Sequence, residues 1–316
     1  MTGASGFIAR ALAERLRDAG WEVAGVDLHA DPERGVVQGD TTVAGDWQQA
    51  AAGAELFIHT AAVVSNVADL ERSWRVNVLG TRHAVEAARD GGAQRFVLLS
   101  SIRAFSDLGF PRDVTETWPV RPDGNPYVDT KIASEQVVLQ AHAAGELAAT
   151  VIRPGDVYGP GSRPWTLLPL QAIKERRVVL PALGRGLMSP VYVDDLVAGV
   201  LLAASAEAGS GQVFTLTSGV GVTCGEFFGC YYRMLGRRGP PVAPTALAAG
   251  LAALIGPLDR ARGRESEANR STMLYLTRAH TYSIAKARGM LGYEPEVGLA
   301  QGMALTEAWL REQRLI

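Results

Sequence analysis

Short runs of apolar residues alternate along the chain with longer stretches in which apolar residues recur every three or four positions. The short runs are typical of buried strands and the longer stretches of amphipathic helices. Their alternation predicts an α/β fold, a parallel sheet covered by helices. We expect strands in residues 21–28, 35–40, 54–62, 95–101, 148–154 and 211–219, and helices in residues 10–20, 70–92, 126–145, 193–206 and 299–313.

Two regions, about 155–190 and about 220–298, do not follow this alternation. We therefore expect two interleaved domains and a closing helix. The sheet domain would contain residues 1–155 and 190–219. A smaller substrate-binding domain would contain residues 156–189 and 220–298, and the C-terminal helix residues 299–316.

Composition narrows the class of protein. The 316 residues are 47% hydrophobic, enough for one large domain or two joined ones, and a formal net charge of −2 argues against a nucleic-acid partner. Cys224 and Cys230 match no common zinc spacing and make no disulfide framework, so we expect no metal site. The most apolar stretch, residues 241–258, is interrupted by Pro and Gly and falls short of the ~20 residues that span a bilayer. With no secretory signal, we expect a cytoplasmic protein.

The opening residues, MTGASGFIAR, place Gly3, Gly6 and Ala9 at three-residue spacing directly before a helix. Such a turn lets backbone N–H groups approach a pyrophosphate at the helix N-terminus. Asp27 ends the next expected strand, where a carboxylate can accept hydrogen bonds from both ribose hydroxyls. No Arg or Lys immediately follows it, so a 2′-phosphate would meet a negative charge. The pattern predicts a doubly wound, Rossmann-type sheet that binds NAD in preference to NADP.

A turn of this kind normally follows the central strand of its sheet, yet only Met1 precedes the TGASGFIA motif. We expect that the natural chain begins upstream, with roughly five to eight mostly apolar residues that form this first strand. The alternative is a rearranged sheet that closes without it.

Tyr127 and Lys131 lie four residues apart on an expected helix, so both side chains face the same way. An ammonium at about 4 Å could lower the pKa of the phenol by about 3 units and make it a base near neutral pH. Ser101 ends an expected strand, at the edge of a parallel sheet where ligands bind. Each residue alone also fits an ordinary helix face or turn, but together with the glycine turn they favour an active site.

Further motifs follow the glycine turn and the Ser101, Tyr127 and Lys131 set. The full series is TGASGFIA, GD at Gly39-Asp40, IHTAA, NVLGT, LLSSI, YVDTK and IRPGDVYGPG. With this series the chain resembles, over almost its whole length, the extended short-chain dehydrogenase/reductase family, within the NAD-dependent epimerase/dehydratase superfamily. The resemblance implies that Ser101, Tyr127 and Lys131 are catalytic and that Lys131 also holds the nicotinamide ribose. It implies a homodimer formed through the helices near 70–90 and 126–142. One minor departure is Thr130, where the family more often has Ser. The cofactor site that it implies contains Gly3, Ser5, Gly6, Phe7, Ile8, Asp27, Asp40, Thr41, Thr60, Ala61, Ala62, Asn77, Tyr127, Lys131 and Pro154.

Some of these residues have more specific roles implied by the resemblance. Asp40 would contact the adenine region, and Asn77 would brace the active-site strand and helix. The segment 59–62 would pass under the cofactor, but we expect His59 itself to be a packed strand residue rather than a catalytic one.

Two motifs that the chain lacks, and one branch that it resembles, indicate its place within the family. Residues 187–203 lack the Arg that sugar-nucleotide epimerases usually carry, and SSIR lacks the acidic pair of the dehydratases. Residues 189–203 and 282–310 resemble the 3β-hydroxysteroid dehydrogenase branch. This similarity implies an NAD(H)-dependent oxidoreductase that interconverts a secondary alcohol and a ketone on a small apolar substrate, a steroid or sterol or a β-hydroxy/β-keto acid.

Two alternatives stay open. One is a sugar-nucleotide epimerase or reductase, and the other is an NAD-binding regulatory protein without turnover, against which the intact Ser101, Tyr127 and Lys131 argue. The apolar segment 241–258 fits a lid over an apolar substrate, a weak membrane contact or a plain packing helix.

Overall fold

The computed structural model describes residues 1–106, 113–263 and 266–316. Its centre is a parallel sheet in which the four strands run in the order β3-β4-β5-β9. A second parallel pair, β1 and β2, lies beyond β3. The strands are β1 (Gly25–Asp27), β2 (Val36–Gln38), β3 (Leu56–His59), β4 (Arg95–Leu99), β5 (Ala149–Pro154) and β9 (Val213–Leu216).

Thr2 joins the two parts of the sheet. It forms isolated parallel bridges to Val26 of β1 and to His59 of β3. The Thr2 amide donates to the carbonyl of Ile58 at 3.1 Å, while the Val26 amide donates to the carbonyl of Met1 at 2.8 Å. The glycine turn that follows is therefore held by backbone hydrogen bonds to both neighbouring strands.

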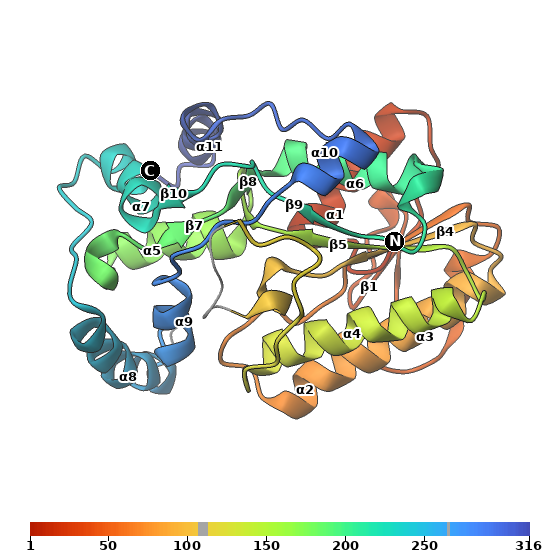
Figure 1. Cartoon of the computed structure of the whole chain (residues 1–316), viewed down its shortest axis with the longest axis horizontal. Helices are drawn as coiled ribbons and strands as arrows, with labels where there is room; N and C mark the ends of the chain where they lie inside the picture. Colours follow the sequence, from red (N-terminus) through yellow and green to blue (C-terminus); the bar gives the residue numbers. More distant parts are fainter. Residues whose placement is uncertain (107–112, 264–265) are drawn as a thin grey trace.

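Helices cover both faces of the sheet, as the alternating pattern predicts (Figure 1). Successive strand residues enter different cores, because side chains alternate between the faces of a strand. On β3, Ile58 packs in the core that contains α1 and α6, whereas Phe57 packs in the core that contains α3 and α4. These helices are α1 (Phe7–Asp18), α3 (Gly80–Asp90), α4 (Pro126–Ala143) and α6 (Val193–Ser205).

The single helix expected over residues 70–92 is three consecutive segments in the structure. They are α2 (Leu70–Trp74), a π-helical turn (Arg75–Leu79) and α3. The π-helical turn contains Asn77, whose side chain is buried and bonded to two other segments of the chain. A widened turn of this kind often marks a functional position.

The remaining segments form a smaller layer beside the carboxyl ends of the strands (Figure 1). Here β6 (Asp156–Tyr158) pairs in parallel with β8 (Pro190–Tyr192), and β7 (Leu187–Met188) pairs antiparallel with β10 (Val222–Thr223). Its helices are α5 (Leu168–Lys174), α7 (Cys224–Met234), α8 (Thr245–Ala261) and α9 (Arg270–Tyr275).

The last two helices return to the rest of the molecule. The helix α10 (Ala285–Leu291) packs on β9 and α6, and α11 (Leu299–Glu312) packs on α7 and β8. Among the described helices, none is both long enough and apolar enough to cross a bilayer.

Candidate active site

One cleft of about 960 Å³ follows the carboxyl ends of the parallel strands. This is the edge at which open α/β sheets bind ligands. The glycine turn lines one end, and segments from α5 to α9 line the other. Of the predicted site residues, Ser5 and Asn77 do not line the cleft. The others line it, namely Gly3, Gly6, Phe7, Ile8, Asp27, Asp40, Thr41, Thr60, Ala61, Ala62, Ser101, Tyr127, Lys131 and Pro154.

The glycine turn has the geometry needed to hold a pyrophosphate. Gly3 has φ +65°, and a Cβ there would lie 2.7 Å from the amide nitrogen of Ala61. Gly6 precedes α1 and gives it no side-chain cap, and the first turn of α1 contains no acidic residue. The N–H groups that begin this helix are therefore available to a phosphate at the positive end of the helix dipole. The residues present fit an NAD pyrophosphate.

Asp27 lies at the end of β1, and its carboxylate is fixed by two backbone amides. Oδ2 accepts from the amide of Ser5 at 2.9 Å, and Oδ1 accepts from the amide of Leu28 at 2.7 Å. The amide of Ser5 thus helps to position the carboxylate. The remaining acceptor capacity of Asp27 faces the cleft, where ribose hydroxyls would donate to it.

Asn77 ties the segment after β3 to the active-site helix. Its Oδ1 accepts from the amide of Val63 at 2.7 Å. Its Nδ2 donates to Thr130 Oγ1 at 2.9 Å and to the carbonyl of Val63 at 3.2 Å. The bracing geometry implied for Asn77 is present. The partner Thr130, where the family more often has Ser, supplies the hydroxyl that Asn77 uses.

His59 is packed inside the sheet and does not line the cleft. Its Nδ1 lies 2.6 Å from Thr2 Oγ1, and its Nε2 lies 3.1 Å from Thr81 Oγ1. Burial, followed by the positive charges of Lys131 and the N-terminus, lowers the pKa of His59 to about 3. A neutral imidazole that bridges two hydroxyls is a structural residue, as the sequence led us to expect.

Tyr127 stands near the start of α4, with its hydroxyl beside that of Ser101. The helix begins at Pro126, and Asn125 caps it by accepting from the Tyr127 amide at 2.9 Å. Burial raises the pKa of the phenol, while the hydrogen bond with Ser101 and the positive charge of Arg103 lower it. Ser101 and Tyr127 are thus brought together in the cleft.

Lys131 lies one turn further along α4, and its ammonium donates to the carbonyl of Leu99. Burial lowers the pKa of Lys131 to about 8, against the opposing effect of Glu135. That this ammonium lowers the pKa of Tyr127 stays a prediction. Another cation, Arg103, lies near the phenol and lowers its pKa.

Arg103 was not singled out from the sequence, although it lies only two residues after Ser101. Its guanidinium carbon is 5.7 Å from the ring centre of Tyr127 and 5.1 Å from that of Tyr275. It donates to Asn66 Oδ1 and, at 3.3 Å, to Ser271 Oγ. Arg103 therefore connects the catalytic edge of the sheet with the segment that contains α9.

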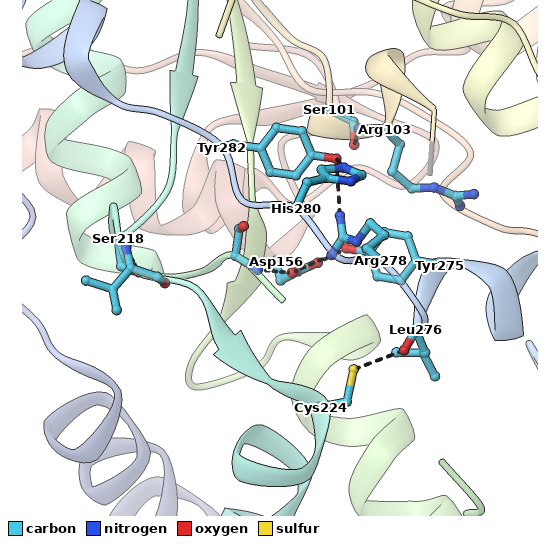
Figure 2. A network of polar contacts seen from close by, with 12 residues as sticks. Ser101, Arg103, Asp156, Ser218, Cys224, Tyr275, Leu276, Arg278, His280 and Tyr282 are labelled. Atoms are coloured by element: carbon cyan, nitrogen blue, oxygen red, sulfur yellow. Dashed lines mark hydrogen bonds and ion pairs between the residues drawn. The ribbon is translucent and has the colours of Figure 1, made fainter. Parts of the chain in front are cut away.

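A second buried network fixes that segment to β6 (Figure 2). Asp156 accepts from Arg278 Nη2 at 3.2 Å and from the hydroxyl of Tyr275. The guanidinium carbon of Arg278 lies 3.8 Å from the ring centre of Tyr275. Since Asp156 and Tyr275 both line the cleft, this network holds its far wall.

Comparison with known proteins identifies the fold and its family. The model of the NAD dependent epimerase/dehydratase family matches residues 1–216. The chain belongs to this family. The match confirms the resemblance seen in the motifs, and with it the Rossmann-type sheet.

Relatives extend the similarity over the whole chain. A 4-hydroxy-2-methyl-3-oxo-4-farnesyl-3,4-dihydroquinoline-1-oxide ketoreductase of Stigmatella aurantiaca is 32% identical, over 98% of this chain and 95% of the relative. A 3-beta-hydroxysteroid dehydrogenase of Mycolicibacterium neoaurum is 28% identical, over 96% of this chain and 88% of the relative. The solved structure of MoeE5 in complex with UDP-glucose and NAD is 25% identical, with a TM-score of 0.81 over 99% of this chain and 98% of that one.

Proposed function

We propose that this protein is an NAD(H)-dependent oxidoreductase that interconverts a secondary alcohol and a ketone on a small apolar substrate. The observation that carries the proposal is the meeting of Ser101, Tyr127 and Arg103 at the end of β4, inside the cleft that also contains the glycine turn. The relatives named for a farnesylated ketone and for a 3β-hydroxysteroid support the apolar class.

Each group has a defined part in the proposed reaction. The Ser101 hydroxyl positions the substrate oxygen beside the phenol, and Tyr127 removes the hydroxyl proton during oxidation or returns it during reduction. Arg103 stabilises the phenolate that forms. Lys131, whose pKa burial lowers to about 8, would hold the nicotinamide ribose. Bound NAD(H) supplies the hydride acceptor or donor.

The walls of the far end of the cleft fit an apolar substrate. Val178, Val179 and Leu180 line it, together with Phe228 and Leu276. Burying such surface against a steroid, a sterol or the alkyl part of a β-keto acid contributes roughly 25 cal/mol per Å². The segments 156–189 and 220–298, which provide these side chains, are proposed as the substrate-binding part.

The test is turnover by the purified protein with NADH and a panel of ketones. The panel includes a 3-ketosteroid, a long-chain β-keto acid and, for the alternative function, UDP-glucose under epimerase conditions. We expect NADH oxidation with an apolar ketone. Tyr127→Phe should lower kcat by about 10²–10⁴-fold while NAD binding is nearly unchanged, since only the proton-transfer group is lost.

Two outcomes would contradict the proposal. Epimerisation of UDP-glucose without ketone reduction would favour the sugar-nucleotide alternative. The structural similarity to MoeE5, which was solved with UDP-glucose and NAD, is the reason to include this substrate. Tight NAD binding without turnover of any member of the panel would favour a regulatory role. The proposed homodimer through residues 70–90 and 126–142 is tested separately, by light scattering of the same preparation.

A further inference from the structure

The outward face of α8 is apolar along its length. Leu247, Leu251, Leu254 and Leu258 are all exposed, from 36% for Leu251 to 74% for Leu254. At about 100° per residue, these four side chains fall within a stripe roughly 60° wide. No residue from 245 to 258 is charged. A helix that faces water normally carries charged residues on that side, so this stripe is suited to contact with an apolar partner.

The opposite face anchors α8 and fixes the direction of the leucines. Ala248, Ala252 and Gly256 are buried, and a Cβ at Gly256 would clash with the backbone of Ala268. Asp259, also buried, accepts from Arg177 Nη1 at 2.8 Å. Figure 1 shows α8 at the periphery of the molecule, beside α9 and away from the sheet. The leucine stripe is therefore held outward.

Exposed arginines stand at the C-terminal end of the helix, where Arg260 lies in the last turn and Arg262 is the C-cap. Arg237 and Arg238 lie before the helix in the chain and are also exposed, and Arg237 donates to the carbonyl of Lys174 at the end of α5. Over residues 235–263 the only acidic residue is Asp259, which is buried against Arg177. A local positive charge on a chain of net charge −2 complements an anionic surface.

We propose that α8 docks this protein on an anionic lipid surface, with its leucine stripe at the acyl boundary and the arginines at its C-terminal end at the phosphates. An apolar helix face next to exposed basic residues is the pattern of an interfacial helix. A second copy of the chain fits less well as the occupant. The stripe of one copy would offer no acidic partner to the arginines of the other, because residues 245–258 carry no charge.

The position of α8 gives the docking a consequence for the reaction. Ile255 and Asp259 line the cleft, so the docked helix would place the cleft entrance at the lipid surface. An apolar ketone could then pass from the bilayer into the cleft without crossing water. This consequence rests on the proposed function, whereas the docking itself does not.

The first test is flotation of the full chain with vesicles of phosphatidylcholine that contain phosphatidylglycerol, against vesicles of phosphatidylcholine alone. We expect binding to the anionic vesicles that weakens with salt. A triple variant, Leu251→Gln, Leu254→Gln and Leu258→Gln, should bind at least about tenfold more weakly, because less apolar surface is buried. The matched control is Leu202→Gln with Leu305→Gln, which are 40% and 45% exposed on α6 and α11. It should bind like wild type.

The second test locates the contact. Leu254→Cys, labelled with an environment-sensitive fluorophore, should shift to shorter wavelength on anionic vesicles, whereas labelled Leu305→Cys should not. Cys224 and Cys230 are buried, which limits background labelling. Arg260→Gln with Arg262→Gln should reduce the binding and its salt dependence.

Three results would overturn the inference. These are no flotation at low salt, equal flotation of the triple variant and wild type, or conversion of a dimer to a monomer by the triple variant without lipid. The last would show that a second copy covers the stripe. All measurements omit NAD and ketone, so a failure of the proposed oxidoreductase activity would leave this result readable, and the reverse also holds.

Discussion

Glu135 and Arg153 form a bidentate ion pair in the interior, directly behind the active-site helix. Arg153 Nε lies 2.9 Å from Oε1, and Nη2 lies 2.7 Å from Oε2. The pair links α4 to β5. Glu135 follows Lys131 by one helical turn and raises its pKa, opposing the effect of burial. A carboxylate of a structural ion pair thus also acts on the pKa of a cleft residue, in part offsetting the larger effect of burial.

Removing one partner of this pair should cost far more than removing both. Glu135→Gln leaves the guanidinium of Arg153 buried without its carboxylate, and we expect unfolding to become easier by about 3–5 kcal/mol. Glu135→Leu combined with Arg153→Met replaces the pair with apolar groups and should cost clearly less. Urea denaturation of the two variants and wild type gives the comparison. A double variant as unstable as the single one would contradict this account.

Asp27 should determine which nicotinamide cofactor is preferred. Asp27→Ala removes the acceptors for the ribose hydroxyls and the charge that repels a 2′-phosphate, so the affinity for NAD should fall by roughly tenfold or more and that for NADP by less. Asp27→Asn keeps an acceptor without the charge and should mainly relieve the rejection of NADP. Fluorescence titration with both cofactors measures this. A wild-type protein that binds NADP more tightly would refute the assignment.

The strands of the parallel sheet and the shared helix of Tyr127 and Lys131 could be predicted because each leaves a local signal. Both faces of β4 are buried, so its residues are nearly all apolar, and Tyr127 and Lys131 show the helical spacing of four. Arg103 and Arg153 were not found because their importance depends on which distant segments surround them. Arg103 meets Ser271 and Tyr275, and nothing in the residues 101–103 indicates this approach.

The glycine turn illustrates the same limit at the level of the backbone. The spacing of its glycines indicated a phosphate site. The sequence does not indicate that Thr2 forms bridges to both β1 and β3. Backbone hydrogen bonds need no particular side chain. The split of the helix expected over residues 70–92 is also not visible locally, because Asn77 is bonded to Val63 and Thr130 from other elements.

His59 should make stability fall in mild acid. Its pKa is about 3 in the folded protein, below the usual value of 6.5, so the unfolded state binds the proton more readily. The contribution is complete above pH 6.5 and is lost as pH falls towards 3, at about 1.4 kcal/mol per pH unit in the steep range. His59→Asn should unfold with a shallower dependence on pH, whereas the exposed His29→Asn should match wild type. Chemical denaturation at several values between about pH 4 and pH 8 gives the slope of the free energy of unfolding against pH for each protein. Equal slopes for all three proteins would exclude His59 as the cause.

Arg103 should set the pH at which oxidation begins. Its positive charge, with the Ser101 hydrogen bond, lowers the pKa of Tyr127 against the effect of burial, and the alcohol can lose its proton only to the deprotonated phenol. Arg103→Gln should therefore move the acidic limb of kcat/KM for oxidation upward by about one to two pH units. This is roughly the effect of removing one charge about 6 Å away at an effective dielectric near 20. Arg103→Lys keeps the charge and should move the limb much less. Arg72→Gln, an exposed arginine that also lines the cleft, should leave it in place. A purely structural role for Arg103 predicts a different result, in which both Arg103 variants lose stability and activity together while the acidic limb stays where it is in wild type.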